Sequence, residues 1–92
     1  MARRRKRPPP LIFKPLLWSL QWDEVDSIED KDDIIVNTIN EGTLDHWHWI
    51  IQIYGKPTIK RLLEQHLASD FHPESRDLAK VVFSVSKFRY AR

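Results

Sequence analysis

Histidines and crowded carboxylates are the side chains of this sequence that could carry chemistry, and the first pair to consider is His46 and His48. They flank Trp47 and stand two positions apart. On a helix, residues two apart point in different directions, whereas metal-binding pairs are spaced near four, as in the H-E-x-x-H motif. We therefore predict no metal site and expect both histidines at the surface or boundary of the fold.

Three carboxylates lie close together in the sequence, at Asp30, Asp32 and Asp33. Paired carboxylates can act as a general acid and base. Neither a nucleophile nor a glycine-rich phosphate loop stands beside them, and acids in the first turns of a helix are favoured by its dipole. We interpret them as helix-stabilising charges and predict a protein that is not an enzyme and uses no cofactor.

Basic side chains form a second class of candidates. In helix–turn–helix readers of DNA, the second helix enters the major groove and its first residues touch bases. Residues 58–61 would hold that position after a turn at Gly55. A basic N-terminal arm adds cations that can bind phosphate backbones. The candidate nucleic-acid-binding residues are Arg3, Arg4, Arg5, Lys6, Arg7, Thr58, Lys60 and Arg61.

Length and composition indicate one domain of 92 residues. Residues 1–10, MARRRKRPPP, combine cations with three prolines and predict a disordered arm, which leaves residues 11–92 as a single helical domain. The chain has no cysteine, and no apolar run approaches the roughly 20 residues of a membrane span. We expect a cytoplasmic protein without disulfides, a membrane contact or a signal peptide.

The net charge of +2 hides a segregation of charge along the chain. Residues 1–7 carry +5, residues 23–45 carry −8 and residues 56–92 carry +4. Such asymmetry indicates a dipolar surface, with one region suited to a cationic partner and another suited to phosphate. The alternative is that the acidic residues only keep exposed helix faces solvated.

Apolar spacing predicts helices over residues 27–41 and 43–54. Ser27 or Asp30 would cap the first helix, and Gly42 would end it in the left-handed conformation. Thr43 would cap the second helix. The predicted buried residues are Ile35, Val36 and Ile39 in the first helix and Leu44, Trp47, Ile50, Ile51 and Tyr54 in the second.

Two further helices follow, opened by Pro57 and Pro73. Their predicted core residues are Ile59, Leu62, Leu63, His66 and Leu67, then Leu78, Val81, Val82 and Val85. The run VVFSVS also suits a strand, but a single strand would have no partner, so we retain a helix. Residues 11–26 predict an irregular segment with one helical turn opened by Pro15. The fold class is therefore all-α, a small four-helix bundle with a helix–turn–helix-like central pair.

Several short motifs give the chain a family resemblance over residues 16–83. They are LLW at residues 16–18, DDIIVNTINEG at 32–42, LDHWHWIIQIYG at 44–55 and ESRDLAKVVF after Pro73. In these motifs the chain resembles a family of short, uncharacterised prokaryotic proteins often encoded beside nucleotidyltransferase-type toxins of the abortive-infection class. The resemblance implies an antitoxin or accessory role in a toxin–antitoxin system, and it supplies no catalytic residues. The basic arm lies outside the family pattern.

Two functional hypotheses follow. The first is an antitoxin that binds a nucleotidyltransferase-type toxin by protein–protein interaction, because aromatic residues anchor interfaces well. Its candidate partner-binding residues are Trp18, Trp22, Asp23, Glu24, Asp26 and Trp49. The second is a DNA-binding or RNA-binding module that uses the basic arm and the helix after Gly55.

Overall fold

Helices make up the fold, and a computed structural model of the chain describes residues 7–66 and 68–85. The helices are α1 (Lys31–Glu41), α2 (Leu44–Tyr54), α3 (Lys56–Gln65) and α4 (Pro73–Phe83), with three 3-10 turns, η1 (Leu11–Leu17), η2 (Trp22–Glu24) and η3 (Ala68–Asp70). No strand occurs in the two described ranges, so the predicted all-α class is confirmed. None of the described helices is long and apolar enough to cross a membrane.

Helix α1 begins at Lys31, so Asp30, the later of the two predicted caps, takes the N-cap position, and the predicted helical range began four residues too early. Residues 27–30 form a turn instead, because Asp26 Oδ2 accepts the N–H groups of Ile28 and Glu29, both at 2.9 Å. The predicted cap Asp30 precedes the helix without a capping bond from its side chain, and its carboxylate accepts the N–H of Asp26 at 2.9 Å. Aspartates that bind nearby N–H groups in this way compete with the helix, which explains its late start.

The buried face of α1 is rotated relative to the prediction. Ile35 and Ile39 are buried as expected, but Ile34 is also fully buried and Val36 is only half-buried. Thr38 completes the inward face, and its hydroxyl donates to the Ile34 carbonyl at 2.6 Å. This bond satisfies the one polar group that α1 sends into the core.

Gly42 ends α1 for a different reason from the one predicted. Its φ of −77° and ψ of 157° are extended, so the predicted left-handed cap is wrong. A Cβ at this position would lie 2.6 Å from the carbonyl oxygen of Thr38. Glycine is therefore needed because the chain passes close to the last turn of the helix.

Helix α2 is tied at its start by His46. The Thr43 N–H donates to His46 Nδ1 at 2.9 Å, and Nε2 lies 2.6 Å from the Ile12 carbonyl oxygen of η1. His46 is buried, so its predicted place at the surface or boundary is wrong, whereas His48 is exposed. The inward face of α2 consists of His46, Trp47 and Ile50, while Ile51 and Tyr54 are half-buried and Leu44 is exposed.

Gly55 forms the corner between α2 and α3, with a φ of +83° that glycine adopts at little cost. Pro57 stands in the first turn of α3, where its missing N–H removes no helical bond. Ile59, Leu62 and Leu63 are buried as predicted and His66 is half-buried. The predicted core residue Leu67 lies outside the described residues.

Helix α4 begins at Pro73 as predicted, but its buried face differs. The Phe83 ring stacks on Trp47 of α2, with ring centroids 5.7 Å apart and planes 16° apart. Because this large ring takes the inward position, Leu78 and Val81 turn outward, and their predicted burial is wrong. The inward residues are Ala79 and Phe83, with Val82 half-buried and Val85 buried just after the helix.

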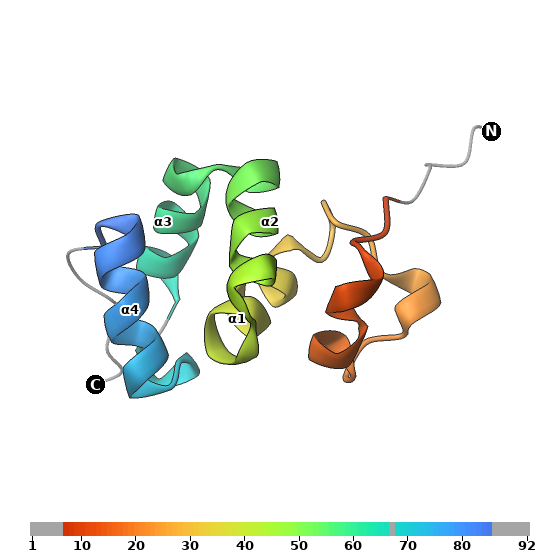
Figure 1. Cartoon of the computed structure of the whole chain (residues 1–92), viewed down its shortest axis with the longest axis horizontal. Coiled ribbons are helices and arrows are strands. Elements are labelled where there is room, and N and C mark those ends of the chain that lie inside the picture. Colours follow the sequence, from red (N-terminus) through yellow and green to blue (C-terminus); the bar gives the residue numbers. More distant parts are fainter. Residues whose placement is uncertain (1–6, 67, 86–92) are drawn as a thin grey trace.

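The N-terminal segment lies at the opposite end of the molecule from α4 (Figure 1). Turn η1 places Phe13 in the core, where its ring lies edge-on to His46 at 4.7 Å and to Trp49 at 4.9 Å. The predicted irregular segment with a helical turn is present, although Pro15 lies inside the turn and does not open it. Residues 11–24 therefore form an anchored segment packed on α1 and α2.

Candidate functional site

The indole ring of Trp18 lies at the surface directly after η1 and is 80% exposed. Leu16 and Leu17, the two residues before it, are buried in the core, so the backbone that carries the ring is anchored. Leu11 and Ile12 of the same turn are also exposed. Tryptophan is highly buried on average, so an exposed ring on an anchored turn is a candidate contact site.

Turn η2 presents three further candidate residues. Asp23 and Glu24 are exposed, and Trp22 is half-buried against the core. The Glu24 N–H donates to the Gln21 carbonyl at 2.8 Å, which closes the turn. We call Trp18, Trp22, Asp23 and Glu24 the aromatic–acidic segment; it combines apolar rings with carboxylates on ordered backbone.

Asp26 does not belong to that surface. It is 5% exposed, and its carboxylate accepts the N–H groups of Arg7 at 2.7 Å and of Ile28 and Glu29 at 2.9 Å. Asp26 as a partner-contact residue stays a prediction, and in this structure its carboxylate is buried and bonded to the backbone. A carboxylate with this many internal donors holds a loop together, which its sequence context does not reveal.

Trp49 has a positioning role within the fold. Its half-buried ring lies edge-on to Phe13 at 4.9 Å and to Tyr54 at 5.8 Å. The first contact joins η1 to the middle of α2, and the second lies within α2. Trp49 therefore packs against the N-terminal segment and is less exposed than Trp18.

Tyr54 has a polar contact that the sequence did not indicate. Its hydroxyl donates to the Ser27 carbonyl at 2.5 Å. Burial, followed by the negative charges of Asp26 and Asp30, raises the pKa of Tyr54 well above its ordinary value. The phenol stays protonated and holds the loop before α1 against the end of α2.

The basic candidates are divided between two places. Arg61 is exposed on α3, while Thr58 and Lys60 are half-buried on the same helix. Arg7 is exposed, but its backbone is fixed: its N–H binds Asp26, and its carbonyl accepts the Ser27 N–H at 2.7 Å. The other four arm candidates, Arg3, Arg4, Arg5 and Lys6, lie outside the described residues.

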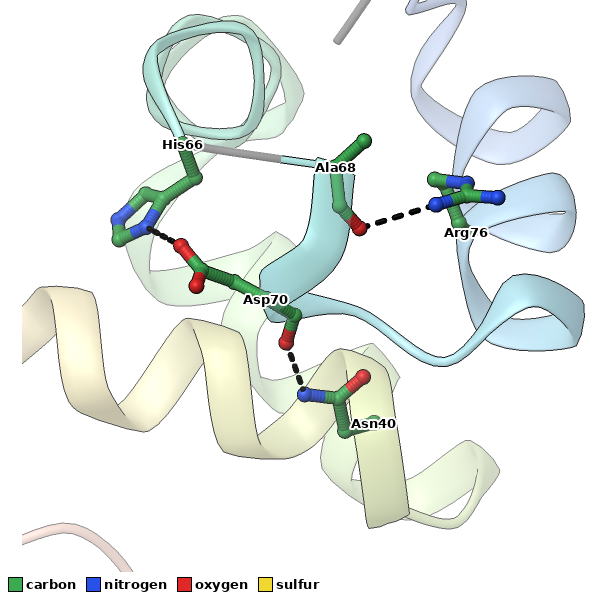
Figure 2. Close-up of polar contacts among 5 residues, drawn as sticks. All are labelled: Asn40, His66, Ala68, Asp70 and Arg76. Carbon is green, nitrogen blue, oxygen red and sulfur yellow. Dashed lines mark hydrogen bonds and ion pairs between the residues drawn. The ribbon is translucent and has the colours of Figure 1, made fainter. Parts of the chain in front are cut away.

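A polar network holds the connection between α3 and α4 against α1 (Figure 2). The Asn40 amide donates to the Asp70 carbonyl and accepts the His72 N–H, both at 2.9 Å. Arg76 donates to the Ala68 carbonyl at 3.0 Å, and His66 Nδ1 lies 3.4 Å from an Asp70 carboxylate oxygen. These polar groups bind backbone or one another, so the network is structural.

The arrangement of the described side chains offers no metal cage. Across residues 7–66 and 68–85, no three histidine, aspartate or glutamate side chains gather in a way that could hold an ion. In the same ranges, no buried side-chain nitrogen or oxygen atom lacks a hydrogen-bond partner. Two candidate surfaces are on the described chain, the aromatic–acidic segment and the side of α3 that carries Lys60 and Arg61.

Comparison with known proteins gave one match. Neither the curated proteins nor the solved structures contained a significant match to the chain. The model of a family of unknown function, DUF6922, matches residues 12–63, which is more than half of the chain and runs from η1 into α3. The matched region includes the aromatic–acidic segment and the α2–α3 corner, and on this match the chain belongs to the DUF6922 family.

Proposed function

We propose that this protein is a non-catalytic accessory protein, an antitoxin, that binds a nucleotidyltransferase-type toxin through the aromatic–acidic segment. One observation carries the proposal: Trp18 is 80% exposed although the two leucines before it are buried. The backbone that carries the ring is thus fixed before a partner arrives, which lowers the entropic cost of binding. Tryptophan is also among the residues most enriched at interface hot spots.

The charge beside the ring favours one class of partner surface. Asp23 and Glu24 are exposed next to Trp22, in the acidic stretch of the chain. Carboxylates around an apolar anchor speed association with a basic surface and disfavour an acidic one. We therefore propose that the toxin presents a cationic rim around an apolar pocket that takes the Trp18 indole.

Co-expression with a nucleotidyltransferase-type toxin, chosen among the products of the neighbouring genes, tests the proposal. We expect a complex on size-exclusion chromatography and protection of the cells from the toxin. Trp18→Ala should weaken binding by about thirty-fold, the effect of a 2 kcal/mol hot spot. Asp23→Lys should slow association and weaken its salt dependence, because Glu24 and the other acids of the stretch remain.

Val81→Ala is the matched control, because Val81 is 78% exposed on α4, far from the segment. It should leave binding unchanged. A chain that stays monomeric beside the toxin and never protects the cells rejects the proposal. If Trp18→Ala and Val81→Ala weaken toxin binding equally, the toxin is bound but not through the aromatic–acidic segment.

A second candidate function is nucleic-acid binding by α3. Within the described ranges, Lys60 and Arg61 make no ion pair with a carboxylate, and Arg61 is exposed. We propose that α2 and α3 form a helix–turn–helix-like pair within a small four-helix bundle. In support, one residue, Gly55, separates the two helices, and α1 contacts α2, α3 and α4.

Fluorescence anisotropy with labelled duplex DNA and with RNA at low salt tests the second candidate. Arg61→Gln and removal of residues 1–6 should each weaken binding and reduce its salt dependence, because fewer phosphates are neutralised. Removal should stop before Arg7, whose backbone bonds hold the 26–27 loop. Lys14→Gln, on η1, is the control; no binding at low salt rejects this candidate.

A further inference from the structure

A pocket of about 350 Å³ lies between the first turn of α3 and the last turn of α4. In Figure 1 these two helix ends lie together, away from η1 and η2. The pocket is therefore separate from the aromatic–acidic segment. Its lining residues are Lys56, Pro57, Lys60, Val82, Phe83 and Ser84.

The charged residues in this lining are both cations. Lys56 and Lys60 are one turn apart, so their side chains rise from the same side of α3. Neither makes an ion pair within residues 7–66 and 68–85, and Glu64, one turn further on, does not line the pocket. Like charges at this spacing repel each other, and an anion between them would relieve that repulsion.

The helix dipoles do not change the sign of this field. The N-terminus of α3 contributes about half a positive charge and the C-terminus of α4 about half a negative charge, so the two nearly cancel. On α4, the N–H groups of Ser84 and Val85 already bind the Lys80 carbonyl, the latter at 3.1 Å. Two full lysine charges therefore dominate the pocket.

The wall of the pocket opposite the lysines is formed before any ligand binds. Phe83 in this wall is 3% exposed and stacks on the buried ring of Trp47, so the wall is part of the core. Ser84 stands beyond it in the left-handed conformation, with φ of 56° and ψ of 39°. Its hydroxyl is exposed and can donate a hydrogen bond.

We propose that this pocket binds a phosphate group, either free or as the terminal phosphate of an ester. Two lysine ammonium groups match the charge of a phosphate dianion, and lysine is a common phosphate ligand. A carboxylate carries half that charge and would leave one lysine uncompensated. The proposal does not depend on toxin binding, because its residues lie outside the aromatic–acidic segment.

Two-dimensional ¹⁵N–¹H NMR of the full chain, at constant ionic strength, tests this assignment. Inorganic phosphate and adenosine monophosphate serve as the two phosphate sources, and adenosine and acetate serve as controls. We expect saturable shifts of the amides of Lys56, Lys60 and Ser84 with both phosphate sources. Equal affinities would mean that the phosphate alone is bound, and tighter binding of the monophosphate would mean that the ester is the ligand.

Single charge removals then locate the site. Lys56→Gln and Lys60→Gln should each weaken binding by about five-fold or more, equal to about 1 kcal/mol, because each removes a charge-assisted contact. Lys31→Gln, on α1, should leave it unchanged. The melting temperature of each variant shows whether the fold is intact. Ser84→Ala tests the hydroxyl of the pocket without removing either lysine charge.

Three results would overturn the proposal. The first is that adenosine produces the same shifts as its monophosphate, the second is that acetate binds as tightly as phosphate, and the third is that folded Lys56→Gln and Lys60→Gln chains bind phosphate as the parent does. A complex with the toxin would remain possible in each case, so the two proposals fail separately.

Discussion

The backbone of Arg7 and the loop at Asp26 are joined by two reciprocal hydrogen bonds. The Arg7 N–H donates to Asp26 Oδ1 at 2.7 Å, and the Arg7 carbonyl accepts the Ser27 N–H at 2.7 Å. Tyr54 binds the same loop through the Ser27 carbonyl. The start of the described chain, the loop before α1 and the end of α2 are therefore held at one point, and Asp26 is its centre.

Replacing Asp26 with alanine should destabilise the protein by about 2–3 kcal/mol, because three backbone N–H groups lose a charged acceptor. Urea denaturation followed by circular dichroism measures the change. Asp23→Ala, at an exposed position in the same acidic stretch, should change stability by less than about 0.5 kcal/mol. Equal effects would show that the carboxylate of Asp26 does not organise the loop.

The Tyr54 hydroxyl should make stability depend on pH in alkaline solution. Burial first, and then the negative charges of Asp26 and Asp30, raise the pKa of Tyr54 in the folded state above its ordinary value of about 10, which applies to the unfolded chain. The stabilisation is therefore complete below pH 10 and declines above it, because only the unfolded state then releases the proton.

Tyr54→Phe isolates this contribution. At neutral pH it should cost about 1 kcal/mol, since one hydrogen bond to the Ser27 carbonyl is lost. Above pH 10 the difference between parent and variant should shrink, and comparing the two isolates the contribution of the Tyr54 hydroxyl. A difference that stays constant up to the highest pH would contradict the raised pKa.

Local signals in the sequence predicted the later helices well. Gly55, Pro57 and Pro73 act through their own backbone restrictions, so the corner after α2 and the starts of α3 and α4 fall where they were expected. The predicted range of α1 began too early, because the carboxylate of Asp26 binds the N–H groups of Ile28 and Glu29 and residues 27–30 form a turn. Arg7, nineteen positions away, binds the other oxygen of the same carboxylate, and no local pattern contains that contact.

The candidate sites were also predictable from the sequence only in part. The exposed Trp18 follows from an aromatic-rich segment with too many apolar residues to bury. The rotation of α4 did not follow, because its run LAKVVFSV offers two apolar faces of similar width. Contact between Phe83 and Trp47 selects one of them. A choice between two helix faces is made by tertiary packing, and it also decides where the pocket beside Lys60 forms.

Gly42 and Gly55 should resist substitution for different reasons. Gly55 has φ of +83° and ψ of 147°, a region that is almost restricted to glycine, so Gly55→Ala should cost about 1–3 kcal/mol. Asparagine relieves strain only in the left-handed helical region, so Gly55→Asn should be no better. At Gly42 the backbone angles suit any residue, and the cost of Gly42→Ala comes from the 2.6 Å approach to the Thr38 oxygen.

Thermal melts of the three variants separate the two mechanisms. A stability of Gly55→Asn close to that of the parent would mean that the corner is a left-handed turn. A neutral Gly42→Ala would mean that the end of α1 can move away from the added methyl group.

His46 should act as a neutral bridge with its proton on Nε2. The Thr43 N–H can only donate, so Nδ1 must accept, and the Ile12 carbonyl can only accept, so Nε2 must donate. Long-range ¹⁵N–¹H spectra of the imidazole should show this tautomer.

His46→Gln should keep the contact with Thr43, because glutamine fills the same capping position in other helices. It should lose only the hydrogen bond to η1, which would cost about 1 kcal/mol of stability. His46→Ala loses both contacts and the edge contact with Phe13, so it should cost about 2–3 kcal/mol. His48→Ala, at an exposed position of the same helix, should leave stability unchanged. If His46→Gln is as unstable as His46→Ala, the contact with Thr43 contributes nothing to stability.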